Sequence, residues 1–293
     1  MASARLEVQV EGHTLSLSNL NKVMYPAVGF TKGEVIDYYT RVAPALLPHL
    51  RDRPLTLKRY PNGVEGGYFY EKNCPSHAPG WVRKERVGEI DYCVCDDLAT
   101  MVWLANLADI ELHPSLSLAD DIDRPTVMAF DLDPGPPAGL PECCEVAVLL
   151  RDALAALGLE SFAKTSGSKG IQVYVPLNVE GVDYRHGTKR LSQGLARHLE
   201  GAHPSLIVSQ QKKELRRGKV LIDWSQNDEH KTTVCVYSLR AREQPTVSTP
   251  LKWSELDDPA ALVFEAADVL ERVSDHGDLF APVAELRQEL PEL

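Results

Sequence analysis

Two aspartates at the end of an apolar segment have the spacing that most directly suggests chemistry. Asp131 and Asp133 close the apolar run 126–133, and Pro134 and Gly135 follow them. On a strand, residues i and i+2 point to the same face, so the two carboxylates would lie about 7 Å apart at Cα and could share a divalent cation. One aspartate of such a pair often caps a turn instead, so both interpretations stay open for this pair taken alone.

A third carboxylate lies inside another apolar segment, Val220-Leu-Ile-Asp-Trp224. An unpaired carboxylate in such a strand would be costly, so Asp223 needs either a basic partner or a metal ion. Three acids on adjacent strands could hold two divalent ions, an arrangement that activates an attacking hydroxyl and stabilises a departing pyrophosphate. The strand alone does not decide between these two possibilities.

A basic hairpin and an aromatic segment could bind a nucleotide. The segment Lys164-Thr-Ser-Gly-Ser-Lys-Gly170 predicts a tight turn that offers hydroxyls, backbone N–H groups and an ammonium group to a triphosphate, although it is not a Walker A loop. In Gly66-Gly-Tyr-Phe-Tyr-Glu-Lys72, Phe69 or Tyr70 could stack on a base. A surface hairpin and core aromatic rings are the alternatives. Further candidate cations are Lys58, Arg59, His113, Arg240 and Arg242.

Charge is unevenly distributed along the 293 residues. The formal net charge is −11, yet residues 22–86 carry +5 and residues 164–242 carry +7, whereas residues 87–163 carry −13 and residues 243–293 carry −9. This order suits a site in which metals lie among carboxylates while cations hold phosphates. With 44% hydrophobic and 25% charged residues, the composition excludes a mostly disordered chain.

The order of predicted elements favours an α+β fold over a doubly wound sheet. A hairpin turns at Glu11-Gly12, and a helix starts at the capping box Thr31-x-x-Glu34 and is kinked or shortened by Pro44 and Pro48. Further helices are predicted at 97–108, 141–157, 183–199 and after Pro250, and strands at 55–60, 90–95, 110–113, 126–133, 161–165, 171–175, 206–208, 220–224 and 233–237. No repeat or flexible linker interrupts them, so we expect one domain over residues 1–293.

The six cysteines form neither a paired zinc motif nor a C-x-x-C motif. Cys74 and His77, with Cys93 and Cys95 following, could hold a structural zinc, but buried reduced thiols are the preferred interpretation. No run of eighteen apolar residues occurs, and the amino terminus lacks the apolar core of a secretory signal. We therefore expect a cytoplasmic protein without a membrane span that begins at or near Met1.

Eight motifs, taken together and in order, resemble the polymerase domain of bacterial ligase D, a member of the archaeo-eukaryotic primase superfamily, and its stand-alone relatives. The motifs cover nearly the whole chain: Leu17–Pro26, Thr31–Glu34, Lys58–Gly63, Phe69–Lys72, Leu112–Pro114, Phe130–Gly135, Thr165–Gly170 and Tyr237–Arg242. The resemblance implies a primase-like catalytic core with an RRM-like sheet and an active site between two packed sheets.

The resemblance also implies an activity. It is that of a nucleotidyltransferase that extends a primer at a DNA double-strand break in non-homologous end joining, prefers ribonucleotides over deoxyribonucleotides and uses two Mn²⁺ or Mg²⁺ ions. The implied partners are nucleoside triphosphates, DNA with a gap or 3′ overhang and a 5′-phosphate, a Ku-type protein and a DNA ligase. The implied location is the nucleoid of a bacterial cell.

By the same resemblance, the candidate residues take four roles. The metal-binding and catalytic residues would be Asp131, Asp133 and Asp223. The incoming nucleotide would be held by Lys58, Phe69, Tyr70, His113, Ser166, Ser168, Lys169 and Arg240. The 5′-phosphate of the downstream strand would be bound by Asn19, Lys22 and Lys32, and the primer or template would lie near Arg216 and Gln226.

Some positions depart from the family pattern, and other functions remain open. Cys74 replaces the usual alanine, the rings Tyr68, Phe69 and Tyr70 leave open which one stacks, and the segment 223–227 differs from its usual form. The alternatives are a stand-alone gap-filling polymerase in excision repair and a non-catalytic module that brings DNA ends together. A phosphatase with Asp-x-Asp at a strand end is disfavoured because Pro134 and Gly135 follow the motif.

Overall fold

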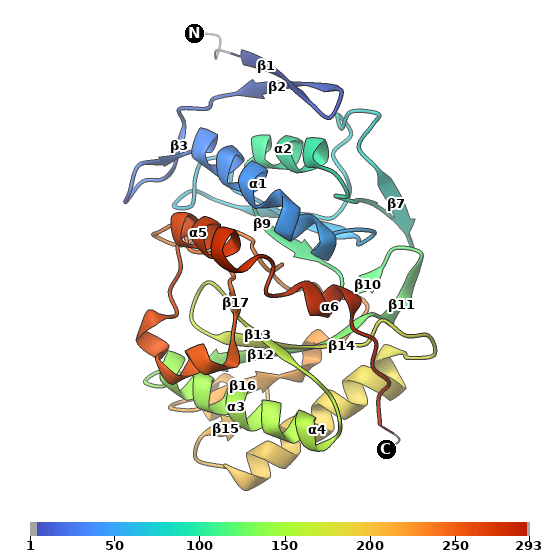
Figure 1. Ribbon diagram of the computed structural model, residues 1–293, viewed down its shortest axis with the longest axis vertical. Helices are drawn as coiled ribbons and strands as arrows, with labels where there is room; N and C mark the ends of the chain where they lie inside the picture. The colour runs from blue at the N-terminus through green and yellow to red at the C-terminus, as the bar shows by residue number, and fades with distance from the viewer. Residues whose placement is uncertain (1–4, 292–293) are drawn as a thin grey trace. The chain divides into compact units, whose positions relative to one another are not determined.

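The computed structural model describes residues 5–291, and the chain divides into two compact units, each assembled from separate segments. Unit 1 comprises Met1–Pro114, Val234–Val247 and Glu265–Asp278; unit 2 comprises Ser115–Thr233, Ser248–Phe264 and Leu279–Leu293. Both units combine helices with antiparallel sheet, so the predicted α+β class is confirmed (Figure 1).

Unit 1 is built around a five-stranded sheet in which β5 pairs with β6, β8 and β9, and β8 pairs with β7. Two hairpins, β1–β2 and β3–β4, precede it. The strands are β1 (Arg5–Val10), β2 (His13–Ser18), β3 (Val23–Tyr25), β4 (Phe30–Thr31), β5 (Leu55–Arg59), β6 (Phe69–Glu71), β7 (Lys84–Val87), β8 (Ile90–Cys93) and β9 (Asp109–Pro114). The helices are α1 (Lys32–Leu46), the 3₁₀ helix η1 (Leu47–His49), α2 (Leu98–Asn106) and α5 (Ala266–His276).

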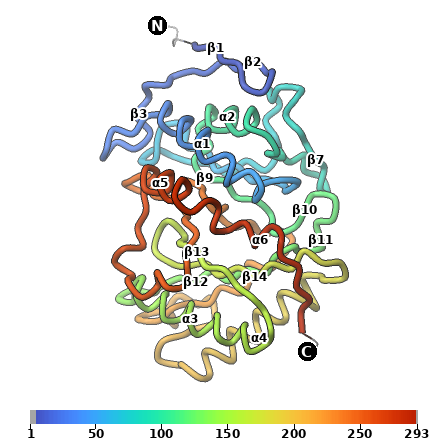
Figure 2. Tube along the Cα trace, viewed as in Figure 1, coloured from blue at the N-terminus to red at the C-terminus, as the bar shows by residue number. Residues whose placement is uncertain are grey.

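Helix α1 connects the early part of unit 1 to its late segments. The Thr31 hydroxyl accepts from the Glu34 amide while the Glu34 side chain accepts from the Thr31 amide, which confirms the predicted capping box. The helix gives way to η1 near Pro48. Its buried Tyr38 and Tyr39 donate to the carbonyls of Tyr237 and Ile110, and α5 lies beside it (Figure 2).

Unit 2 is built on a six-stranded sheet of order β15-β16-β12-β14-β13-β17, antiparallel except for β15–β16. The sheet consists of β12 (Val127–Pro134), β13 (Phe162–Thr165), β14 (Ile171–Pro176), β15 (Ile207–Val208), β16 (Val220–Asp223) and β17 (Pro250–Leu251), and a separate two-stranded sheet consists of β10 (Ser117–Leu118) and β11 (Asp121–Pro125). Its helices are α3 (Leu140–Ala156), the π-helical turn η2 (Tyr184–Thr188), α4 (Lys189–Ala202), the 3₁₀ helices η3 (Lys213–Leu215), η4 (Trp224–Gln226), η5 (Trp253–Asp257) and η6 (Pro259–Ala261), and α6 (Ala281–Glu285).

The core of unit 2 lies between one face of this sheet and helices α3 and α4 (Figure 1). Phe130, Leu132 and Ile222 point into it from β12 and β16. Because side chains alternate along a strand, the residues between them must point to the opposite face. That alternation determines where the polar residues at the strand ends lie.

Several expectations need correction. Residues 233–237, predicted to be a strand, belong to no strand, because Tyr237 has a φ of 64° and Ser238 N–H donates to Cys235 in a turn. After Pro250 the chain forms the short strand β17, which was not predicted, and then the predicted helices, two 3₁₀ helices followed by α5 and α6. Cys74 and Cys93 form a disulfide instead of remaining reduced, whereas Cys95, Cys143, Cys144 and Cys235 are free and buried, as predicted.

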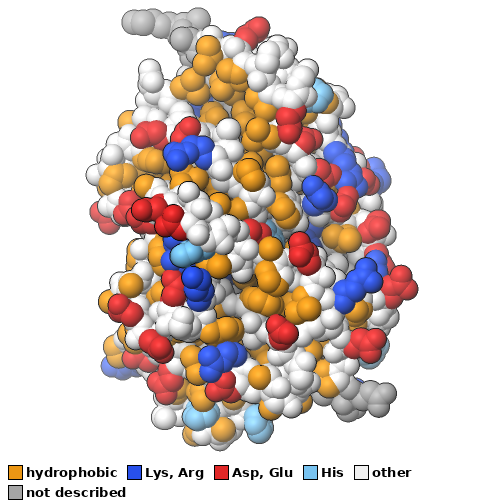
Figure 3. All heavy atoms as spheres, viewed as in Figure 1, with side chains coloured by type: hydrophobic (Ala, Val, Ile, Leu, Met, Phe, Trp, Pro, Cys, Tyr) orange, Lys and Arg blue, Asp and Glu red, His pale blue; other side chains and the backbone are white. Residues whose placement is uncertain are grey.

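The surface carries both signs of charge. On the face drawn in Figure 3, Lys and Arg side chains lie among Asp and Glu side chains rather than in one continuous basic area. Within residues 5–291, every helix is too short or too polar to cross a membrane.

Candidate functional site

Three carboxylates converge on one face of the unit 2 sheet. In the antiparallel pairing of β12 with β16, Asp131 lies opposite Asp223 and Asp133 lies opposite Leu221. Residues directly opposite each other share a face, as do residues i and i+2 of one strand. Asp131, Asp133 and Asp223 therefore lie on the face that is turned away from the core under α3 and α4, as the strand alternation predicts.

The electrostatics of Asp131 reflect this crowding. Burial raises the pKa of Asp131 to about 7, and the charges of Asp133 and Asp223 contribute in the same direction. Gln172 on β14 opposes the shift by donating from Nε2 to Asp131 Oδ1 at 3.1 Å. Buried Lys164 in turn donates to Gln172 Oε1, so Asp131 is oriented by a chain of side chains from the neighbouring strands.

Asp223 is held by donors from the segments around it. Gln211 Nε2 donates to Oδ1 at 2.7 Å, the Ser225 hydroxyl donates to the same atom at 2.6 Å, and Gln226 Nε2 donates to Oδ2 at 2.9 Å. Arg216 donates to the Gln211 side chain at 2.7 Å. The structure thus brings Arg216 and Gln226, both predicted to lie near the primer or active site, into one hydrogen-bonded group with Asp223.

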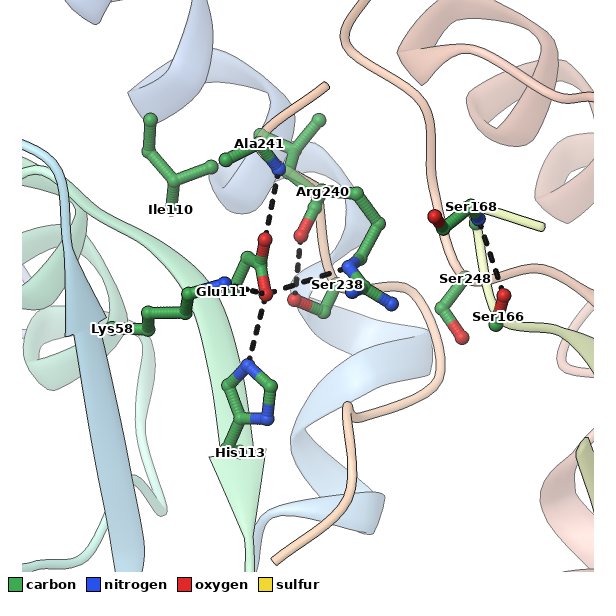
Figure 4. A network of polar contacts seen from close by, with 12 residues as sticks. Lys58, Ile110, Glu111, His113, Ser166, Ser168, Ser238, Arg240, Ala241 and Ser248 are labelled. Atoms are coloured by element: carbon green, nitrogen blue, oxygen red, sulfur yellow. Dashed lines mark hydrogen bonds and ion pairs between the residues drawn. The ribbon is translucent and has the colours of Figure 1, made fainter. Parts of the chain in front are cut away.

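The hairpin between β13 and β14 packs against the end of β12. A Cβ atom on Gly170 would lie 2.0 Å from the Leu132 carbonyl oxygen, so only glycine allows this approach. The Ser166 hydroxyl accepts from the amides of Ser168 (Figure 4) and Gly170 and so shapes the turn. Ser168 and Lys169 are exposed at its tip, where a phosphate could reach them.

The carboxylate oxygens of Asp131, Asp133 and Asp223 can be compared with the ligands that a divalent cation prefers. Carboxylate oxygens are hard ligands of the kind that Mg²⁺ and Mn²⁺ prefer, and a cation would offset the repulsion that raises the pKa of Asp131. As the side chains stand, no three His, Cys, Asp or Glu residues among residues 5–291 form a metal-binding cluster. The acids fit a hard divalent ion in chemistry and strand register, whereas Cys74 of the Cys74–His77 zinc alternative is bonded to Cys93 in a disulfide.

A second polar group lies in unit 1, where β5 runs between β6 and β9. Lys58 pairs in register with Tyr70 on one side and with Glu111 on the other, and His113 follows on β9. Arg240 enters from the late segment of the unit, and its backbone carbonyl accepts from the Tyr25 hydroxyl. Glu111 contacts Lys58, His113 and Arg240 together, so three of the predicted nucleotide-binding cations meet at one carboxylate (Figure 4).

The aromatic segment presents its rings to both sides of the unit 1 sheet. Lys58 Nζ lies 4.6 Å from the ring centre of Tyr68 and 5.6 Å from that of Tyr70, which also lies 6.1 Å from the His113 ring. Phe69 alternates to the other side and stacks under the Arg59 guanidinium. Of the two predicted stacking rings, the structure brings Tyr70 to the cation group and places Phe69 away from it.

The third predicted group also lies in unit 1, at the start of α1. Asn19, with a φ of 55°, forms a turn in which the Lys22 amide donates to its carbonyl, and the Lys32 amide donates to the Lys22 carbonyl. Burial and the charge of Lys22 lower the pKa of Lys32 to about 8. The charge of Lys22 thus acts on Lys32, although Lys22 Nζ donates to the Pro61 carbonyl and Lys32 Nζ to the Ser18 carbonyl.

Several residues of these groups were not predicted from the sequence, among them Glu111, Gln172, Gln211 and Ser225. Gln172 is a single polar residue in the apolar strand β14, whereas Glu111 alternates with Asp109 and His113 along β9. The signal available for Gln172 was the same as for Asp223, a polar residue inside an apolar strand that must find a partner. For Glu111 it was the i, i+2 spacing with Asp109 and His113, which places the three side chains on one face of a strand.

Comparison with known proteins decides the family. The model of the LigD primase-polymerase domain matches residues 31–280. The chain belongs to this family. The match includes the three acids, the hairpin and the cation group of unit 1, whereas Asn19 and Lys22 precede it.

Relatives of the family cover most of this chain. It is 41% identical over 273 residues to the multifunctional non-homologous end joining protein LigD of Mycolicibacterium smegmatis, and 33% identical over 264 residues to the bifunctional LigD of Bacillus subtilis. These matches cover 91% and 90% of this chain but only 36% and 43% of the relatives. The polymerase domain of Mycobacterium tuberculosis ligase D, solved in complex with DNA, superimposes with a TM-score of 0.86 at 40% identity, covering 94% of this chain and 99% of that one.

Proposed function

We propose that this chain is a primer-dependent nucleotidyltransferase that adds nucleotides to a DNA 3′ end at a double-strand break during end joining. The observation that carries the proposal is the register of Asp131, Asp133 and Asp223 on one sheet face, next to the hairpin 166–170. Membership of the LigD primase-polymerase family supports polymerase chemistry. The proposal treats residues 1–293 as one functional domain.

The residues divide the chemistry between them. The primer 3′-hydroxyl oxygen attacks the α-phosphorus of the triphosphate and its proton passes to solvent water. The bond between that phosphorus and the departing pyrophosphate breaks. Two Mn²⁺ or Mg²⁺ ions, when bound, would acidify that hydroxyl and offset the developing negative charge. Asp131, Asp133 and Asp223 would hold the ions, and Gln172 and Gln226 orient two of the carboxylates by hydrogen bonds.

The remaining candidate residues would bind nucleotide and DNA. In unit 2, exposed Ser168 and Lys169 and the turn shaped by Ser166 suit phosphate groups. In unit 1, the cations Lys58, His113 and Arg240 suit the phosphates of a nucleotide, with Tyr70 rather than Phe69 beside them. Asn19, Lys22 and Lys32 suit the 5′-phosphate of a downstream strand. The solved relative is a polymerase domain in complex with DNA, which supports a DNA substrate. Ribonucleotide preference and cooperation with a Ku-type protein and a ligase belong to the proposal.

Primer extension tests the catalytic assignment. A labelled duplex with a short gap is incubated with ribonucleoside or deoxyribonucleoside triphosphates and Mn²⁺ or Mg²⁺. We expect extension, faster with ribonucleotides, and a loss of at least about 100-fold in Asp131→Asn. The matched control is Asp152→Asn on the exposed side of α3, which should extend like the wild type. Absence of extension by the wild type, or full activity of Asp131→Asn, would refute the proposal.

The same substrates separate the alternative functions. Activity on 3′ overhangs that must be brought together supports end joining, whereas activity confined to short gaps would replace it with gap filling in excision repair. Binding that depends on the 5′-phosphate, without any incorporation, would instead indicate a non-catalytic module that brings DNA ends together.

A further inference from the structure

Glu111 is a buried carboxylate that only donors surround. Its side chain is 2% exposed, and it lies 3.1 Å from Lys58 Nζ, 3.0 Å from His113 Nε2 and 3.5 Å from Arg240 Nε. The Tyr60 hydroxyl donates to Oε1 at 3.2 Å, and the Ala241 amide donates to the same atom at 3.0 Å. These contacts come from β5, β9 and the late segment of unit 1, and no sequence motif assigns a role to Glu111.

The ionisation of Glu111 determines which nitrogen of His113 carries a proton. Burial alone would raise the pKa of Glu111, but the hydrogen bond to His113 and the charges of Arg240 and Lys58 hold it well below its usual value. An ionised carboxylate can only accept, so His113 Nε2 must be the donor in their 3.0 Å contact. A neutral His113 then has only a lone pair at Nδ1, which repels a phosphate oxygen. The imidazolium form alone can donate to both Glu111 and a phosphate.

We propose that Glu111 is the positioning residue of the nucleotide site and holds Lys58, Arg240 and His113 so that His113 meets the triphosphate as an imidazolium. This inference rests on the proposed function, since it assigns the triphosphate to the cation group of unit 1. It adds that nucleotide binding takes up a proton at His113.

The groups facing His113 set the direction of the pH dependence. Burial lowers the pKa of His113, the hydrogen bond and charge of Glu111 raise it, and the charges of Arg240 and Lys58 lower it further. Tyr70 faces the same ring from β6 without a charge. Removal of the Glu111 charge therefore lowers the pKa of His113 and makes the imidazolium harder to form.

A simple effect of net charge would have the opposite sign. Glu111→Gln makes the site more positive by one charge, so nucleotide binding would tighten if total charge were decisive. Under the proposal nucleotide binding weakens. The glutamine amide has only one acceptor oxygen, and its NH₂ group would face donors from which the Glu111 carboxylate accepts. The sign of the change in KM distinguishes the two accounts.

The experiment measures KM and kcat for a ribonucleoside triphosphate between pH 7.5 and 9.5, where the triphosphate is fully ionised. A primer–template without a downstream strand excludes any contribution from Lys32. For the wild type we expect KM to rise with pH while kcat changes little. In Glu111→Gln we expect KM to be about tenfold higher at pH 7.5, and NMR titration to show the pKa of His113 lowered by about one unit.

Two further variants test the proposal even if Glu111→Gln folds poorly. Asp109→Asn is the matched control, because this buried neighbouring residue on β9 accepts from the Lys58 amide through Oδ1, as the oxygen of an asparagine also can; it should leave KM and its pH dependence unchanged. His113→Gln still donates to Glu111 but cannot become charged, so its KM should be high and independent of pH. Wild-type KM values in Glu111→Gln, or an unchanged pH dependence in His113→Gln, would overturn the inference while normal extension leaves the proposed function standing.

Discussion

In the absence of a bound cation, the ionised form of Asp131 lowers the stability of the folded protein. Because burial, Asp133 and Asp223 raise the pKa of Asp131 to about 7, the folded state retains a proton that the unfolded chain releases near pH 4. Stability is therefore lost as pH rises from about 4 to 7. A shift of about three units corresponds to at most about 4 kcal/mol, and partial exposure of Asp131 reduces this to roughly 1–3 kcal/mol.

We therefore predict that Asp131→Asn stabilises the metal-free protein at pH 8 by roughly 1–3 kcal/mol, since the amide removes the repulsion. Added Mn²⁺ should raise the melting temperature of the wild type more at pH 8 than at pH 5.5, and should have little effect on the variant. Thermal unfolding with and without Mn²⁺ at the two pH values measures both effects. A less stable variant at pH 8 would contradict this account of Asp131.

Lys32 gives a second prediction that depends on pH. Burial and Lys22 lower its pKa to about 8, so part of its charge is lost just above neutral pH, and a bound 5′-phosphate would restore that charge. We expect a 5′-phosphate to strengthen DNA binding about 10- to 100-fold at pH 7 and several-fold less at pH 9. Fluorescence anisotropy with matched 5′-phosphate and 5′-hydroxyl duplexes gives this ratio. Lys32→Arg should keep the ratio constant, whereas a constant wild-type ratio would exclude Lys32 from the pocket.

At the scale of elements, the hairpin between β13 and β14 depends on one glycine. A Cβ on residue 170 would meet the Leu132 carbonyl at 2.0 Å, which is rigid backbone of β12. We predict that Gly170→Ala displaces the turn, destabilises the protein by about 1–3 kcal/mol and raises KM for nucleotide, because Ser168 and Lys169 move with the turn. Unfolding and extension assays measure the two effects.

The control for this prediction is Gly194→Ala in α4, where a Cβ meets no atom within 4 Å. Alanine favours the helix by up to about 1 kcal/mol, so this variant should be slightly more stable and fully active. If both variants behaved alike, the close approach at Gly170 would not be what positions the hairpin.

The elements that could be predicted from sequence are those with a local cause. The capping box at Thr31, the turn at Glu11-Gly12 and the apolar runs of β12 and β16 each depend on residues near one another in the chain. Strand β6 and the irregular path at 233–237 could not be predicted, because pairing with distant β5 decides the first and the backbone of Tyr237 the second.

The same distinction applies to the candidate site. The spacing of Asp131 and Asp133 identifies them as candidate site residues in the sequence, and the position of Asp223 in an apolar strand identifies it in the same way. The role of Glu111 as a partner of several cations becomes apparent only in the structure, where strand pairing places Lys58 beside it and a late segment of the chain contributes Arg240. No rule of sequence spacing connects residues that far apart.

At the scale of the whole molecule, a net charge of −11 must be reconciled with DNA as the proposed partner. The cations proposed to contact phosphate form small groups, each within one unit, and the charges on the face drawn in Figure 3 are mixed. General attraction to DNA should therefore be weak, and binding should depend on few specific contacts.

These few contacts give a measurable dependence on salt. Each phosphate neutralised on duplex DNA contributes about −0.9 to the slope of log K against log salt concentration, so contacts from Lys22, Lys32 and Arg216 predict a slope of about −2 to −3. Replacing the 5′-phosphate by a hydroxyl should make the slope shallower by about 1 to 2, because Lys22 and Lys32 lose their partner. The acidic surface adds no cations, so a slope steeper than about −6 would imply an extended basic surface instead. A slope near zero, or one that is unaffected by the 5′-phosphate, would mean that these lysines do not bind DNA phosphates.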